Sequence, residues 1–149
     1  MAFERFTKDA RATVLTASEE EARSSGQGTI EAEHLLLALA AHPDLRELGL
    51  DHYALVAALA QEEERSLAAV GIAAGDFDLP VTRSRRPKPK LATSAKLALQ
   101  RALTIAVDRG ERRIHANHLL YGVLAAERGR VARALQIAGI DVDELRARI

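Results

Sequence analysis

A ten-residue pattern occurs twice in this chain, at a separation of 84 residues, and this repetition restricts the fold more than any other feature of the sequence. The first copy starts at Ile30 and reads IEAEHLLLAL, and the second starts at Ile114 and reads IHANHLLYGV. Ile, Ala, His and two Leu residues keep their places, while Glu33 is replaced by Asn117. A fixed period with shared apolar positions predicts two copies of one structural unit that bury a common core.

The composition indicates that the repeated unit is helical. Apolar residues make up 48% of the chain and aromatic residues only 3%, and the apolar set is mostly Ala, Leu, Val and Ile, which suits packed helices. A length of 149 residues suits one compact domain. We therefore expect an all-α fold in which residues 1–149 form a single domain.

Helical periodicity and capping residues predict a series of helices in each half. Thr7, Asp51 and Thr93 are the expected N-caps of three of them, and Gly26 and Gly110 follow the first helix of each half. On the helix after Asp51 we expect Val56, Leu59, Leu67 and Val70 to face inward and residues 61–65 largely to face solvent. The expected helices span 8–24, 32–41, 52–70, 93–109, 116–127 and 131–138, and a last one starts after Asp141.

The two halves differ in length and are joined by a segment without helical periodicity. From the repeated histidine to the next Gly-apolar-Asp turn, the first copy is six residues shorter than the second, so it should lack most of one short helix. We expect repeat one at 1–71, a linker at 72–90 and repeat two at 91–149. The linker holds five basic residues: Arg83, Arg85, Arg86, Lys88 and Lys90. They suit a solvated tether or a contact for an acidic partner, and without interleaved aromatic residues nucleic acid is disfavoured.

These features, in this order, resemble the N-terminal domain of the Clp/Hsp100 unfoldases, in particular the ClpC type. The stretches that carry the resemblance are FERFTKDA, EEAR, the repeated pattern, and the turns LGLD and AGID. The resemblance implies an all-α bundle of two pseudo-symmetric Clp repeats with about four helices each. No Gly-x-x-x-x-Gly-Lys-Ser/Thr loop occurs, so the family's ATP-binding AAA+ modules are not expected here. A stand-alone homologue is expected; an excised domain is the alternative.

The resemblance also implies a function in recognition. Clp N-terminal domains recognise substrates and adaptors, so we expect a non-catalytic module that binds proteins, peptides or Clp-targeting cyclic peptides. The alternative is a regulatory or structural interaction protein that has lost the family's phosphoarginine binding. The ClpC-type resemblance implies a bacterial protein. Lys plus Arg equals Asp plus Glu at 21 each, and cysteine is absent, so we expect a cytoplasmic protein with no nucleic-acid or membrane partner, no cofactor and no metal. No nucleophile, base and orienting group can be nominated.

Glu33 is the candidate ligand-binding residue. The resemblance implies that the Glu of each repeat takes the guanidinium of phosphorylated arginine, and a carboxylate at a helix N-terminus suits this role. Asn117 cannot form that charge-assisted pair, and Ala32 and Ala116 replace the family's Thr. One altered site at most is therefore expected, and a purely structural role of Glu33 in the first helical turn is the alternative.

The other candidates are the repeated histidines and a peptide groove. We expect His34 and His118 to be buried residues that hydrogen-bond loop backbone, because a metal site would need further ligands at consistent spacing.

In the resembling family a groove near the N-terminus takes cyclic peptides and adaptor segments. By position this implies Phe3, Leu91 and Lys96, with Leu91 replacing the family's Phe. Alternatively, Phe3 and Phe6 pin the N-terminal arm to the core.

Overall fold

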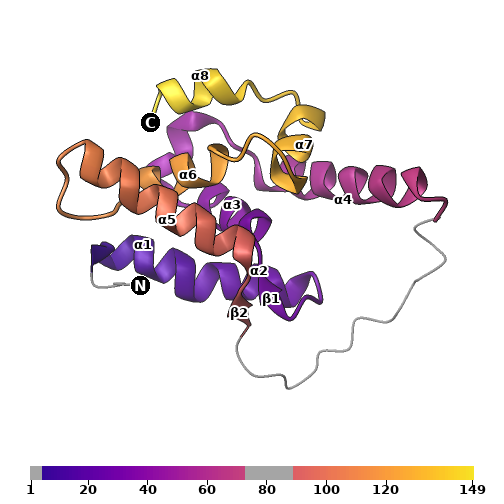
Figure 1. Ribbon diagram of the computed structural model, residues 1–149, viewed down its shortest axis with the longest axis horizontal. Coiled ribbons are helices and arrows are strands. Elements are labelled where there is room, and N and C mark those ends of the chain that lie inside the picture. Colours follow the sequence, from indigo (N-terminus) through magenta and orange to yellow (C-terminus); the bar gives the residue numbers. More distant parts are fainter. Residues whose placement is uncertain (1–4, 73–88) are drawn as a thin grey trace.

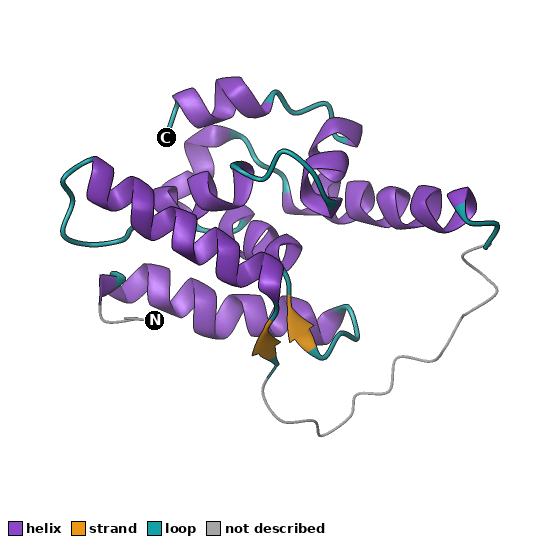
Figure 2. Ribbon diagram, in the orientation of Figure 1, coloured by secondary structure: helices purple, strands orange, loops and turns teal. Residues whose placement is uncertain are grey.

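The computed structural model describes residues 5–72 and 89–149, which form a bundle of helices with two very short strands (Figure 1; Figure 2). The predicted all-α class and its two helical repeats are confirmed. Only part of the predicted linker, residues 72–90, lies within the described residues. The elements in chain order are α1 (Lys8–Ala12), the π-helical turn η2 (Thr13–Ala17), α2 (Ser18–Ser24), β1 (Thr29–Ile30), α3 (Ala32–Ala40), the 3-10 helix η3 (Pro43–Leu48), α4 (His52–Ala69), β2 (Lys90–Leu91), α5 (Thr93–Asp108), α6 (Ala116–Leu124), α7 (Arg130–Ile137) and α8 (Val142–Ala147).

Each repeat pairs its backbone with the other one. β1 and β2 are parallel, and Ile30 lies opposite Leu91. Phe6 forms the matching parallel bridge with Ile114. At β1 and β2, the segment before α3 of repeat one pairs with the segment before α5 of repeat two. At the bridge, the segment before α6 of repeat two pairs with the segment before α1 of repeat one. This reciprocal pairing makes the two repeats one pseudo-symmetric unit.

The first helix of repeat one carries one residue more than its counterpart. The N-caps Thr7 and Ala92 are 85 positions apart, whereas the C-caps Ser25 and Arg109 are 84 apart. The π-helical turn at Thr13–Ala17 lies inside this helix. A π turn adds one residue to a helix without ending it, so the predicted helix at 8–24 exists and absorbs its extra residue there.

The caps follow the prediction at three helices and depart from it at α5. The side chains of Thr7, Asp51 and Asp141 accept backbone N–H groups at the starts of α1, α4 and α8. The predicted cap Thr93 is instead the first residue of α5, and Ala92 is its N-cap without a side-chain bond. The hydroxyl near this helix start that makes contacts is that of Ser94, which accepts the N–H of Ala32 at 2.9 Å.

α3 and α6, the helices of the repeated pattern, lie in the centre of the bundle (Figure 1). Every residue of α3 from Ala32 to Leu39 is buried. Five of their leucines are fully inaccessible to solvent: Leu35, Leu36, Leu39, Leu119 and Leu120. The unbroken apolar run of the pattern is therefore explained by neighbours on all sides.

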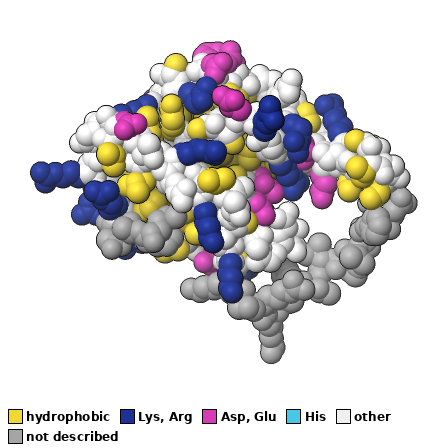
Figure 3. Space-filling view, viewed as in Figure 1, with side chains coloured by type: hydrophobic (Ala, Val, Ile, Leu, Met, Phe, Trp, Pro, Cys, Tyr) yellow, Lys and Arg dark blue, Asp and Glu magenta, His cyan; other side chains and the backbone are white. Residues whose placement is uncertain are grey.

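The inward face of α4 matches the prediction at Leu59 and differs from it at Val56 and Val70. Val70 is 71% exposed and Val56 is also exposed, while Glu62, predicted to face solvent, is only 3% exposed. The second half of α4 extends past the body of the protein, and apolar side chains lie open at its end (Figure 3). Because α7 packs against α4, the buried stripe follows Leu55, Leu59 and Glu62 at helical spacing.

Candidate functional site

The repeated histidines close the starts of α3 and α6. Nδ1 of His34 accepts the backbone N–H of Glu31 at 2.8 Å, and Nδ1 of His118 accepts that of His115 at 2.9 Å. Their exposed fractions are 1% and 0%. Each histidine therefore completes a capping box, in which the third helical residue satisfies the N–H of the N-cap. The predicted structural role of both is confirmed.

Ser25 lies beside His34, but the two do not form a catalytic pair. The distance from Ser25 Oγ to His34 Nε2 is 3.0 Å. Because Nδ1 accepts a backbone N–H, the proton of the neutral ring is on Nε2, which donates to Ser25. The Ser25 hydroxyl in turn donates to the carbonyl of Ala22 at 3.0 Å. A general base needs a free lone pair facing the nucleophile, and His34 presents a proton there.

Burial lowers the pKa of both His34 and His118, although nearby carboxylates act in the opposite direction. The unfolded chain therefore takes up these protons first, at about pH 6.5. We expect the free energy of unfolding to fall between pH 7.5 and pH 5.5, by at most about 1.4 kcal/mol per pH unit for each histidine. Urea denaturation followed by circular dichroism at several pH values measures this slope.

The matched control for this pH dependence is the double substitution His34→Gln with His118→Gln. Glutamine in the same place of a capping box accepts the same N–H but does not titrate. The double variant should show a flatter dependence of unfolding free energy on pH. An equal slope in variant and wild type would show that other groups cause the effect.

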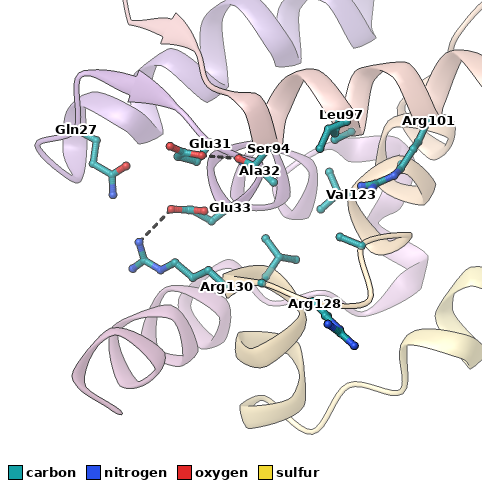
Figure 4. Close-up of a pocket in the computed structure, with 15 residues that line it drawn as sticks. Gln27, Glu31, Ala32, Glu33, Ser94, Leu97, Arg101, Val123, Arg128 and Arg130 are labelled. Carbon is teal, nitrogen blue, oxygen red and sulfur yellow. Dashed lines mark hydrogen bonds and ion pairs between the residues drawn. The ribbon is translucent and has the colours of Figure 1, made fainter. Parts of the chain in front are cut away.

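A cavity of about 520 Å³ lies between the start of α3, α5 and the turn that leads into α7 (Figure 4). Both repeats contribute to it. Its apolar lining comes from Leu97, Ala98, Val123, Ala126 and Val131. Its charged lining comes from Glu31, Glu33, Arg101, Arg128 and Arg130. An open, partly apolar hollow with converging charges is a typical place for a ligand.

Glu33, the predicted ligand-binding residue, lies in this cavity and is engaged by a guanidinium of its own chain. Nη1 of Arg130 donates to Glu33 Oε1 at 3.0 Å (Figure 4). Glu33 is 8% exposed, and burial raises the pKa of its carboxyl although Arg130 lowers it. Gly129, with a φ of 110°, precedes Arg130 and allows the sharp turn into α7. The chain thus supplies the kind of group that Glu33 was predicted to take from outside.

Arg130 also joins Glu33 to a second buried carboxylate. Its Nε lies 3.3 Å from Oε2 of Glu62, whose Oε1 accepts from Arg133 at 2.8 Å and from Ser66 at 2.7 Å. Burial acts to raise the pKa of Glu62, but the hydrogen bonds from Ser66 and Arg133 outweigh it and lower that pKa. These contacts link α3 and α4 of repeat one to α7 of repeat two.

Sequence reasoning did not identify this cluster. The i, i+3 spacing of Arg130 and Arg133 on one helix, and the place of Glu62 on the stripe of Leu55 and Leu59, were the available signals. Neither signal names its partner, because the contact joins residues about 70 positions apart. The cluster is visible only once α7 packs on α4.

The remaining charges of the cavity fall into two kinds. The carboxylate of Glu31 accepts from the hydroxyl of Ser94 at 2.5 Å. The side chains of Arg101 and Arg128 have no ion-pair or hydrogen-bond partner within 5–72 and 89–149. The cavity therefore contains acidic groups that are already bonded and basic groups that are not.

The residues of the predicted peptide groove do not meet in this cavity. Leu91 is half-buried in β2 and packs against the core, and Lys96 is exposed in the first turn of α5. Neither lines the cavity. Phe3 lies outside the described residues. Asn117, the counterpart of Glu33, is half-buried in the first turn of α6. The groove at these positions stays a prediction.

Comparison with known protein families gives a match over nearly the whole chain. The model of the Clp repeat N-terminal domain matches twice, at residues 5–84 and 90–149. The chain belongs to the Clp repeat N-terminal domain family. The two matched ranges correspond to the two helical repeats described above. A search of curated protein sequences gives no significant match.

Solved structures of Clp/Hsp100 N-terminal domains share the fold. The N-terminal domain of the chaperone ClpD from Arabidopsis thaliana is similar with a TM-score of 0.74 and 23% identity, over 99% of this chain and 93% of that one. The Hsp104 N-terminal domain from Candida albicans is similar with a TM-score of 0.65 and 16% identity, over 95% and 87% of the two chains. A chain from a malarial protein secretion system is similar with a TM-score of 0.65 and 19% identity, over 96% of this chain and 90% of that one.

Clp N-terminal domains are interaction modules that typically bind the substrates and adaptors of Clp chaperones. The part of this Clp N-terminal domain that the structure describes contains no helix long and apolar enough to cross a membrane. The same residues hold no group of three or more His, Cys, Asp or Glu side chains placed for a metal ion.

Proposed function

We propose that this chain is a non-catalytic binding module for proteins and peptides related to the Clp unfoldase–protease system. Its ligands would be unfolded substrates, adaptors or Clp-targeting cyclic peptides, and its location the bacterial cytoplasm. Membership of the Clp repeat N-terminal domain family supports this function. The observation that carries it is the open cavity of about 520 Å³ at the junction of the two repeats, with apolar and charged residues side by side.

A second candidate is a regulatory interaction protein that keeps this fold without binding phosphoarginine. The specific observation in its favour is the contact of Arg130 with Glu33 at 3.0 Å. A phosphoarginine side chain would have to displace Arg130, which also contacts Glu62. In the other repeat, the neutral amide of Asn117 replaces the carboxylate.

One set of titrations tests the function and separates the two candidates. We expect fluorescein-labelled, reduced and carboxymethylated α-lactalbumin, an unfolded protein, to give a saturable rise in anisotropy with this chain. A flat titration would contradict the proposed function. Calorimetric titration with free phosphoarginine separates the two candidates. A heat of binding that is seen with wild type and lost in Glu33→Gln supports a retained phosphoarginine site. No heat of binding with wild type supports the regulatory candidate.

A further inference from the structure

The acidic side of the cavity is already neutralised by the chain itself. Glu33 is paired with Arg130, and Glu31 accepts a short hydrogen bond from Ser94. A cationic ligand would find both carboxylates bonded. It would also lie in the same cavity as Arg101, whose positive charge repels it.

The basic side of the cavity is open. Arg101 and Arg128 line it without a side-chain partner among the residues described, and they lie away from Gln27 and Glu31 in Figure 4. Arg101 extends from α5 toward Val123 and is half-buried. A partly desolvated guanidinium gains more from an anion than one surrounded by water, and its planar N–H groups match a carboxylate.

An apolar surface adjoins these arginines. Leu97 is 41% exposed on the face of α5 that lines the cavity, and the half-buried Ala126 and the buried Val123 belong to the same lining. A ligand that fits both features carries an anionic group next to an apolar side chain. Such a group can come from an acidic side chain or from the free C-terminus of a peptide.

We propose that this cavity selects a carboxylate flanked by an apolar residue, with Arg101 as the main contact and Arg128 as a second one. This inference rests on the proposed function, because it names the ligand chemistry of the same cavity. Arg130 fills the acidic subsite at Glu33, and the recognised charge is therefore negative. The pairing of Glu33 with Arg130 thus turns the specificity of the cavity from cations to anions.

Three short peptides at constant ionic strength test the inference by ¹H–¹⁵N NMR. Acetyl-Leu-Leu-Glu-amide carries a side-chain carboxylate, acetyl-Leu-Leu-Gln-OH carries a terminal one, and acetyl-Leu-Leu-Gln-amide carries none. We expect saturable shifts at Leu97, Arg101 and Val123 with at least one of the two acids, and about tenfold weaker binding of the neutral peptide. Whichever acidic peptide binds more tightly identifies the source of the carboxylate, a side chain or a C-terminus.

Two substitutions test whether the positive charge of Arg101 causes the preference for a carboxylate. Arg101→Gln should weaken binding of the acidic peptide about tenfold and leave binding of the neutral peptide unchanged. Arg112→Gln removes the same charge from an exposed loop position outside the cavity lining and should change neither. Equal affinity for the acidic and neutral peptides, or full affinity in Arg101→Gln, would overturn the inference.

The outcomes also distinguish this inference from the proposed function. If the labelled unfolded protein binds and none of the three peptides prefers a carboxylate, the ligand chemistry is wrong and the binding function stands. If the acidic peptide binds through Arg101 and no unfolded protein binds, the cavity is a carboxylate site and the protein-binding function is wrong.

Discussion

Replacing Arg130 by methionine is expected to lower the free energy of unfolding by about 3 kcal/mol. The change leaves Glu33 without its ion-pair partner and Glu62 with Arg133 as its remaining ion-pair partner. Both carboxylates are buried, at 8% and 3% exposed. Removing one member of a buried ion cluster costs more than the pair contributes, because the remaining charge lacks both water and a partner. Methionine keeps most of the aliphatic length, so the loss measures charge more than packing.

Arg133→Met is the matched control for that variant. The Arg133 side chain is more than half exposed and contacts only Glu62 among the carboxylates of the cluster, so its loss should cost about 1 kcal/mol or less. Glu33→Gln added to Arg130→Met should recover part of the lost stability, because no buried charge then remains at Glu33. Urea denaturation at pH 7.5 compares the variants. Equal losses for the two arginines, or no recovery, would show that Arg130 acts through packing.

Gly122→Ala is expected to destabilise the protein by about 3 kcal/mol, near the upper end of overpacking effects. A Cβ atom at this position of α6 would lie 2.2 Å from the carbonyl oxygen of Ala98 on α5. The obstacle is backbone, so no rotamer change relieves it and the two helices must move apart. The same movement would widen the cavity that Ala98 and Gly122 line.

The sign of this effect decides between two physical terms. Helix propensity alone predicts that Gly→Ala within a helix stabilises by about 1 kcal/mol, while the backbone contact predicts a loss. Gln100→Ala, at an exposed position of α5, should change the stability by less than about 0.5 kcal/mol. A thermal or urea midpoint for Gly122→Ala at or above that of wild type would refute the close contact.

Much of the fold could be predicted because its signals are local. The repeated pattern predicted two like units, the capping side chains of Thr7 and Asp51 predicted helix starts, and glycines predicted ends. The failure at α5 has a non-local cause. Thr93 is a good capping residue type, but α5 has Ala92 as its N-cap, and its hydroxyl contact is made by Ser94, which accepts the N–H of Ala32 at the start of α3.

The candidate site was predicted only in part. Glu33 was singled out because the family resemblance implies a ligand role for the Glu of each repeat, and in the second repeat Asn117 replaces it. The structure places Glu33 in a cavity. Its partner Arg130 lies 97 positions away, and nothing in the local pattern of α7 marks that residue as bound to α3. Glu62 was expected to face solvent because charged residues on a helix usually do. Its burial follows from the position of α7.

The sequence by itself determined the helical class, the two-fold repetition and the buried histidines, since each depends on spacing, capping and burial patterns within a few turns of chain. The tertiary structure alone decided which charged side chains form ion pairs with each other and which have no partner among the described residues. Ion pairs among Glu33, Glu62 and Arg130 arise from the way α7 of one repeat packs beside α3 and α4 of the other. An electrostatic site of this kind depends on distances across the core, and those distances are set by packing.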